Sequence, residues 1–218
     1  YHSFNFMNGS DPEFIGKSPF SDTLTMTLEG NLHYDENDAI FQELIGTTDT
    51  TCTHGLELIP DYASTIVRNY YGDTSATYNY PVYLVNQTSG VKVIEVKDRH
   101  LFGIQEALDS NGVWRPIEFK GHDFCGRGYY GVKLYPNEYA LMAFPKYQGN
   151  FKTKLRVRIK SGDDIYVSQS FEGTINEQQF YFEKEEYLRK DLQKYKAEII
   201  EYKFYGAWPV EAGDPSVE

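Results

Sequence analysis

The sequence predicts a mainly β protein, an antiparallel β-sandwich of immunoglobulin-like or jelly-roll-like type with one C-terminal helix. Composition gives the first reason: 19 Tyr and 14 Phe stand against 3 Met and 2 Trp, and aromatic side chains pack well on a half-buried strand. The second reason is a series of short alternating segments separated by turn residues. A helical period appears only near the C-terminus.

Composition also excludes some classes of protein. The chain has 218 residues and a net charge of −11, which opposes a general nucleic-acid binder because such proteins need a basic face. No window approaches ~18 consecutive apolar residues, so we expect no membrane-spanning helix. The chain begins with Tyr1 rather than Met, which favours a processed, exported protein in the periplasm or at the cell surface.

These patterns divide the chain into four regions. Residues 1–21 form an N-terminal extension and residues 22–182 the β-sandwich domain. Residues 183–208 hold the C-terminal helix, with a last strand as an alternative for their second half. Residues 209–218 are predicted to be a tail, because this segment has little to bury.

The first predicted strand starts at Asp22, where Leu24, Met26 and Leu28 alternate with threonines. Further strands, each bounded by turn residues, are predicted over residues 77–85, 91–96, 113–119, 129–135 and 139–144. The segment 109–112 predicts a hairpin with a type I′ turn, because its Asn-Gly pair supplies the positive φ values that this turn needs.

Residues 151–160 show the clearest alternation in the chain. One face is apolar, and the other carries five cations that we call the cationic row: Lys152, Lys154, Arg156, Arg158 and Lys160. Residues 161–164 should turn the chain, and residues 165–171 should pair back onto this strand. The register is well defined, since a slip of one residue would bury all five cations.

The cationic row has two interpretations. The first is a solvated outer face, whose lysines protect a sheet edge from aggregation. The second is a docking stripe for an acidic surface of a partner. We predict that the row contributes to docking. Changing Lys154, Arg156 and Arg158 together should then slow association with the partner and leave the melting temperature nearly unchanged, because exposed ion pairs are individually weak.

The C-terminal region changes to a helical period. Asn176 is placed to cap a helix, with Gln179 positioned for the reciprocal bond of a capping box. Five apolar residues then recur at four- and three-residue steps: Leu188, Leu192, Tyr195, Ile199 and Tyr202. We predict a helix over about residues 183–196. Residues 197–205 fit a helix or a last strand, and the sequence leaves both open.

Two cysteines and two histidines form the most specific cluster. Cys52, His54, His122 and Cys125 could complete a tetrahedral zinc shell, although their spacing matches no common zinc module. The alternatives are a Cys52–Cys125 disulfide and two unpaired thiols. We predict the disulfide, and we expect no cofactor.

No catalytic residue is predicted. A nucleophile reading of Cys125 with His122 and Asp123 fails, because three neighbours on one tight loop rarely line up as a triad. Paired carboxylates for glycoside hydrolysis could be drawn from Glu95, Asp98, Glu106, Glu118 and Asp123, with no spacing that favours any pair. Asn8 and Asn86 match the glycosylation sequon, a match that is usually chance in bacteria.

The tyrosines suggest a ligand platform. Tyr78, Tyr80, Tyr83, Tyr129 and Tyr130 could stack on a sugar or line a protein interface. Ordinary packing on strands, with the hydroxyls at the rim, explains them as well.

Residues 134–139, 149–155 and 168–180 resemble exported β-sandwich proteins of the Bacteroidota cell envelope. Some of these proteins are accessory subunits of the type IX secretion and gliding apparatus, including a periplasmic plug of the translocon. The resemblance implies a non-catalytic role in which the chain docks on another cell-envelope protein. The alternatives are a carbohydrate-binding or adhesin module and a glycoside hydrolase.

Overall fold

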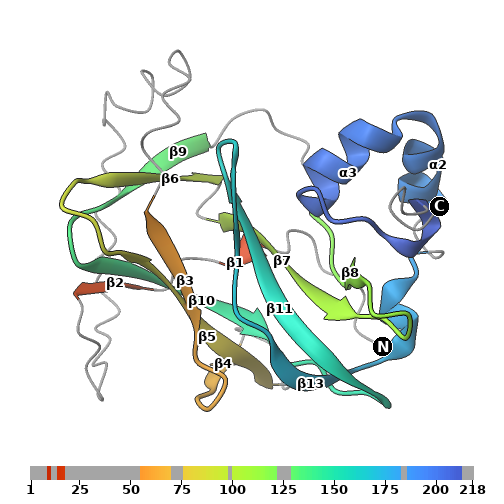
Figure 1. The fold of residues 1–218 in the computed structure, drawn as a ribbon. Coiled ribbons are helices and arrows are strands. Elements are labelled where there is room, and N and C mark those ends of the chain that lie inside the picture. Colours follow the sequence, from red (N-terminus) through yellow and green to blue (C-terminus); the bar gives the residue numbers. More distant parts are fainter. Residues whose placement is uncertain are drawn as a thin grey trace.

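The computed structural model describes residues 9–10, 14–17, 55–69, 76–97, 100–121, 129–182 and 186–212. These residues form two antiparallel sheets that pack face to face, with helices at the C-terminal end (Figure 1). The predicted class, an antiparallel β-sandwich with C-terminal helical structure, is therefore confirmed.

The larger sheet has eight strands. Its main order is β12 (Asp164–Val167), β11 (Phe151–Ser161), β7 (His100–Leu108), β6 (Lys92–Lys97) and β9 (Tyr129–Leu134). Three short strands add to it: β1 (Gly9–Ser10) and β8 (Trp114–Pro116) pair with β7, and β13 (Phe171–Ile175) pairs with β11.

The smaller sheet has five strands. Its order is β2 (Phe14–Lys17), β10 (Glu138–Pro145), β5 (Ala76–Asn86) and β3 (Leu56–Pro60), and β4 (Ile66–Asn69) also pairs with β5. Two strands, β1 and β2, come from the predicted N-terminal extension. The strand predicted from Asp22, with Leu24, Met26 and Leu28, lies outside the described residues.

The main core lies between the two sheets. Val82, Leu84 and Met142 of the smaller sheet share one buried apolar cluster with Ile94 and Ile159 of the larger sheet. The sheets approach closely at β7, where a Cβ on Gly103 would lie 2.8 Å from the Phe144 ring and 3.2 Å from Ile159. Side chains of both sheets thus interlock without room for another methyl group.

The strand β11 follows its predicted pattern. Leu155, Val157 and Ile159 are buried, and the alternate residues are half-buried or exposed. Its hairpin partner β12 pairs Arg158 with Val167, as the predicted return over residues 165–171 requires. The partner strand is interrupted, however, and resumes as β13 opposite the first half of β11.

The turn after β7 is a hairpin of a different type from the prediction. Gly112 N–H donates to the Asp109 carbonyl over 3.0 Å, and Asp109 N–H donates to the Val113 carbonyl over 2.8 Å. Gly112 has φ +78, whereas Asn111 is not among the residues with positive φ. The geometry is that of a three-residue loop with one left-handed glycine, and the predicted type I′ turn is wrong.

The C-terminal region contains two helices rather than one. Asn176 and Gln179 form the predicted capping box, but the box starts the 3-10 turn η2 (Glu177–Phe180). The helices α2 (Glu186–Lys194) and α3 (Lys196–Phe204) follow, so residues 197–204 are helical and the alternative of a last strand is wrong. A short 3-10 turn, η3 (Val210–Ala212), ends the described chain.

The chain breaks between the helices at Tyr195, whose φ of −133 and ψ of 47 are not helical. The break resets the phase of the apolar face. Leu188 and Leu192 are buried as predicted, but in α3 the buried residues are Ile200, Lys203 and Phe204. Tyr195 and Tyr202, which were predicted on the apolar face, are exposed.

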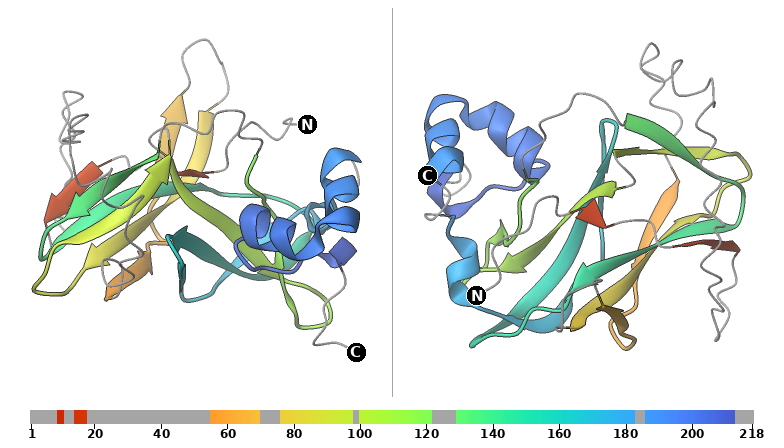
Figure 2. Two further views of the ribbon diagram at one scale, coloured as in Figure 1. Left: turned by 90° about the horizontal axis from the view of Figure 1, so that it is seen from above. Right: turned by 180° about the vertical axis from the view of Figure 1, so that it is seen from behind.

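The helices pack on the outer face of the larger sheet, next to β7 and β8 and away from β2 and β5 (Figures 1 and 2). Their second core contains Ile104 and Phe119 together with Leu188, Ile200 and Phe204. Residues 209–212, predicted as the start of a tail, join this region, and Ala212 is buried. No helix among the described residues is long and apolar enough to cross a membrane.

Candidate functional site

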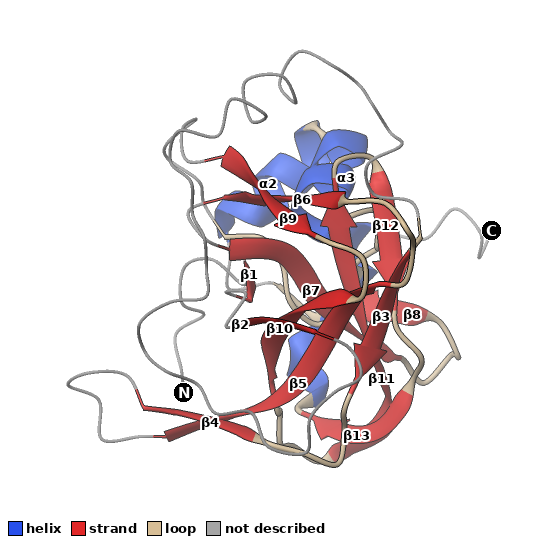
Figure 3. Cartoon of the chain, turned by 90° about the vertical axis from the view of Figure 1, so that its left-hand side faces the viewer, coloured by secondary structure: helices blue, strands red, loops and turns tan. Residues whose placement is uncertain are grey.

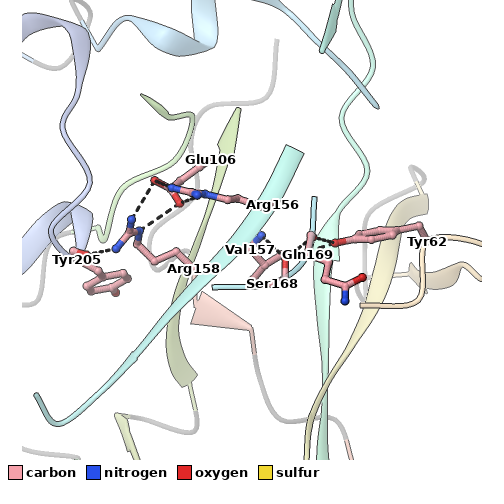
Figure 4. A network of polar contacts seen from close by, with 8 residues as sticks. All are labelled: Tyr62, Glu106, Arg156, Val157, Arg158, Ser168, Gln169 and Tyr205. Carbon is pink, nitrogen blue, oxygen red and sulfur yellow. Dashed lines mark hydrogen bonds and ion pairs between the residues drawn. The ribbon is translucent and has the colours of Figure 1, made fainter. Parts of the chain in front are cut away.

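The cationic row runs along the outer face of β11, where the register aligns it with β7. Arg156 lies directly opposite Glu106, and Arg158 lies opposite Ile104. The Arg156 Nε donates to Glu106 Oε2 over 2.7 Å, and Arg158 Nη2 donates to Glu106 Oε1 over 3.3 Å (Figure 4). The carboxylate of Glu106, whose side chain is 1% exposed, is thus shared by two arginines whose side chains are 19% and 15% exposed.

Each of these arginines has a second partner. The Arg156 guanidinium lies 4.2 Å from the centroid of the Trp114 ring, a stacking contact that favours a cation over an aromatic face. Arg158 Nη1 donates to the Tyr205 carbonyl over 3.2 Å. Tyr205 is the left-handed C-cap of α3, and a cation at a helix C-terminus is favourable because the carbonyls there carry partial negative charge.

Further polar contacts attach the C-terminal region to the larger sheet. Arg115 bonds to Asp109 and donates to the Trp208 carbonyl over 3.1 Å. The buried Lys203 donates to the Gly121 carbonyl over 2.8 Å, and burial lowers the pKa of its amine. These bonds, with the apolar cluster beneath, hold the helices in one position.

The remaining cations of the row differ in their surroundings. Lys160 pairs with Glu201 of α3. Lys152 and Lys154 are exposed and form no ion pair within the described part of the chain. Residue 154 lies opposite Glu172 of β13, and residue 152 lies opposite Thr174.

The cationic row therefore divides into two parts. We call Lys152 and Lys154 the outer pair, and Arg156 and Arg158 the inner pair. The sequence-based expectation that the row has little influence on stability does not fit the inner pair, because both of its members are bonded to the buried Glu106.

A second polar network joins the two sheets beside this row. Val157 N–H donates to Ser168 Oγ over 2.9 Å, and Tyr62 OH donates to the Gln169 carbonyl over 2.7 Å (Figure 4). Burial raises the pKa of Tyr62 to about 12. Tyr62 thus ties the loop after β3 to the interruption between β12 and β13.

Two of the acidic candidates, Glu106 and Glu118, do not form a hydrolytic pair. Glu118 is buried between the sheets and accepts from Gln105 Nε2 over 2.9 Å and from Tyr147 OH over 2.5 Å. Gln105 and Glu106 are neighbours on β7, so their side chains point to opposite faces of the sheet. Glu106 and Glu118 therefore cannot flank one glycosidic bond.

Of the other three acidic candidates, only Glu95 lies in the described part of the chain. Glu95 Oε2 accepts from the Gly162 N–H over 3.2 Å at the tip of the β11–β12 hairpin. Asp98 and Asp123 lie outside the described residues.

The tyrosines of β5 face opposite sides of their sheet. Tyr80 packs with Phe171 and Tyr62, with ring centroids 4.8 and 5.7 Å away, whereas Tyr83 packs on Tyr139 on the other face. Tyr78 is exposed beside Val67, its cross-strand neighbour, where β4 and β5 extend from the sandwich (Figure 3).

The structure thus does not bring Tyr78, Tyr80 and Tyr83 onto one platform. Tyr129 and Tyr130 belong to β9, and their side chains are not among those described.

Two further sequence-based predictions concern the cysteine–histidine cluster and the glycosylation sequon at Asn86. Cys52, His54, His122 and Cys125 lie outside the described residues, so the disulfide stays a prediction. In the described ranges no group of three or more His, Cys, Asp or Glu is placed to hold a metal. Asn86 is fully buried, and its Nδ2 donates to the carbonyls of Gly90 and Leu134, so the sequon amide organises a loop in the fold.

Sequence reasoning missed Glu106 as the partner of the inner pair, and it missed Tyr62 and Tyr205. Only the register between β7 and β11 brings Glu106 to the arginines, and β7 shows no alternation that would have revealed it.

Comparison with models of known protein families and with curated proteins finds no match for this sequence. The fold and the polar network define a β-sandwich protein with a helix pair clamped to one sheet.

Proposed function

We propose that this protein is a non-enzymatic docking protein that binds another cell-envelope protein through the outer face of its larger sheet. One observation carries this proposal. The inner pair and Lys160 are engaged within the molecule, whereas the outer pair is exposed on the same face. The helices pack on Ile104 of β7, whereas Lys152 and Lys154 in the first half of β11 are exposed to a partner.

The resemblance to exported envelope proteins supports an extracytoplasmic location and a role as an accessory subunit of a secretion complex. Neighbouring apolar side chains would extend the surface, since Ile165 and Val167 of β12 are exposed beside the other half of the row. Interfaces of this kind combine a few charges that steer association with apolar area that holds the complex.

Capture of partners by the purified protein from an envelope extract tests the proposal. The K152E/K154E variant should lose a protein that the wild type retains, because it reverses the exposed charge. The matched control K190E/K194E changes two exposed lysines of α2 and should retain the same protein. If the wild type, K152E/K154E and K190E/K194E all capture the same envelope proteins in the same amounts, this face is not the docking surface.

A second function is favoured by a separate observation. Tyr78 is 55% exposed and Val67 53% exposed, and they continue the surface of Tyr80 on an extended pair of strands. This surface could stack on a sugar ring. Saturable binding of a neutral oligosaccharide that is abolished by Tyr78→Ala would establish the carbohydrate-binding alternative.

A further inference from the structure

We propose that the segment docked on the cationic row is an acidic stretch of polypeptide, whose carboxylates pair with Lys152 and Lys154. This inference rests on the proposed function and specifies the chemistry of the partner at the same face. It follows from the local balance of charge, the spacing of the free amines and the overall charge of the chain.

The local balance of charge leaves the row short of carboxylates. Among the described residues, three carboxylates lie at or across from its five cations, and two of the three form ion pairs with the row. Glu106 is shared by the inner pair, Glu201 pairs with Lys160, and Glu172 lies across the strand pair from Lys154. The row thus keeps an excess of two positive charges on a chain whose net charge is −11.

The excess lies where a partner can reach it. The inner pair is largely covered by Glu106, Trp114 and the C-terminus of α3. The outer pair is exposed, and alternate residues of a strand recur every ~7 Å on one face. Two carboxylates at a similar spacing on a partner segment would meet both amines at once.

A polypeptide fits this site better than a nucleic acid does. Polyanions bind by releasing counterions from many phosphates, and two free amines would release few. The strongly negative molecule would also repel a long polyanion over its whole length. A short acidic segment presents its charge only at the row, and its neutral side chains can contact Thr174 and Trp114 at the margins.

Fluorescence anisotropy with labelled probes tests this inference on the full chain at low ionic strength. The probes are a peptide in which Glu alternates with Thr, the same peptide with Gln in place of Glu, and an oligothymidylate. The Glu peptide should bind more tightly than either of the others. The K152Q/K154Q variant should weaken its binding about fivefold, a size expected for two exposed ion pairs. The control K190Q/K194Q should bind it as the wild type does.

Two results would overturn the inference. One is tighter binding of the oligothymidylate than of the Glu peptide, and the other is equal binding of the Glu peptide by K152Q/K154Q and the wild type. Neither result contradicts the proposed docking function if the K152E/K154E variant fails to capture an envelope protein that the wild type captures. Conversely, unchanged capture by K152E/K154E would contradict the proposed function, even if the Glu peptide binds at the outer pair.

Discussion

Glu106 is the residue on which the outer face of the larger sheet depends. Its carboxylate is buried and lies 2.7 Å from Arg156 Nε and 3.2 Å from Arg158 Nε. Removal of the charge would leave two half-buried guanidinium groups without an anion, and breaking such a pair is costly because the remaining charges cannot regain full hydration.

We therefore expect Glu106→Gln to lower the free energy of unfolding by about 3 kcal/mol. Urea unfolding followed by tryptophan fluorescence measures this effect. Glu172→Gln, which removes an exposed carboxylate from the same face, is the matched control and should change stability little. Equal unfolding midpoints for Glu106→Gln and the wild type would contradict the structural role of the inner pair.

Glu118 gives a prediction about pH. Burial raises the pKa of this carboxyl above its ordinary value of 4.5, although bonds from Tyr147 and Gln105 oppose the shift. The folded protein thus holds the proton more tightly than the unfolded chain does. The resulting stability is fully present below pH 4.5 and is lost as the pH rises through the raised, folded value.

Glu118→Gln removes this titration. Over that pH window, the stability of the wild type should fall relative to the variant as the pH rises. Urea unfolding at a series of pH values measures the difference between the two proteins. Parallel curves for the two proteins would show that Glu118 has the same pKa in both states.

At the scale of elements, the sequence predicts strands with alternating faces, such as β11, and apolar runs between turn residues, such as the fully buried residues 139–144 of β10. The strand β11 was predicted correctly, because its cations alternate with apolar residues that are buried in the structure. The strand β7 was not predicted, because its residues 103–107 are all buried and include the polar Gln105 and Glu106. The segment therefore shows neither an alternation of apolar and polar residues nor a continuous apolar run. The contact residues of the inner pair, Glu106, Trp114 and Tyr205, lie in other parts of the chain, and only the placed strands and helices bring them to the arginines.

The helix break at Tyr195 shows a second limit of the sequence. The spacing of apolar residues continues through the break, so a single period can be drawn over two helices whose faces differ in phase. Side-chain packing on Ile104 and Phe119, which lie far away in the sequence, decides which residues of α3 are buried.

Gly149 gives a prediction at the same scale. A Cβ at this position would lie 2.1 Å from the backbone carbonyl of Ile175, so the loop before β11 touches the end of β13 backbone to backbone. Gly149→Ala must separate the two segments, and we expect a loss of about 2 kcal/mol or more in thermal or urea unfolding. Gly90→Ala is the control, because a Cβ there meets nothing within 4 Å. Equal losses for both variants would contradict the close approach.

For the whole molecule, the division of the cationic row separates stability from binding. The inner pair joins β11 to β7 and to the end of α3, so R156Q/R158Q should lower the melting temperature. The outer pair contacts no described carboxylate at ion-pair distance, so K152Q/K154Q should melt within about a degree of the wild type. Differential scanning calorimetry of the two double variants measures both effects, and equal melting temperatures would contradict the division.

The association rate between K152Q/K154Q and the captured envelope protein, measured at low and at high ionic strength, tests the docking role most directly. At low ionic strength the variant should associate several-fold more slowly than the wild type, because long-range attraction is least screened there. At high ionic strength the two rates should converge. Association of the variant at the wild-type rate at low ionic strength would show that Lys152 and Lys154 are only part of a solvated face.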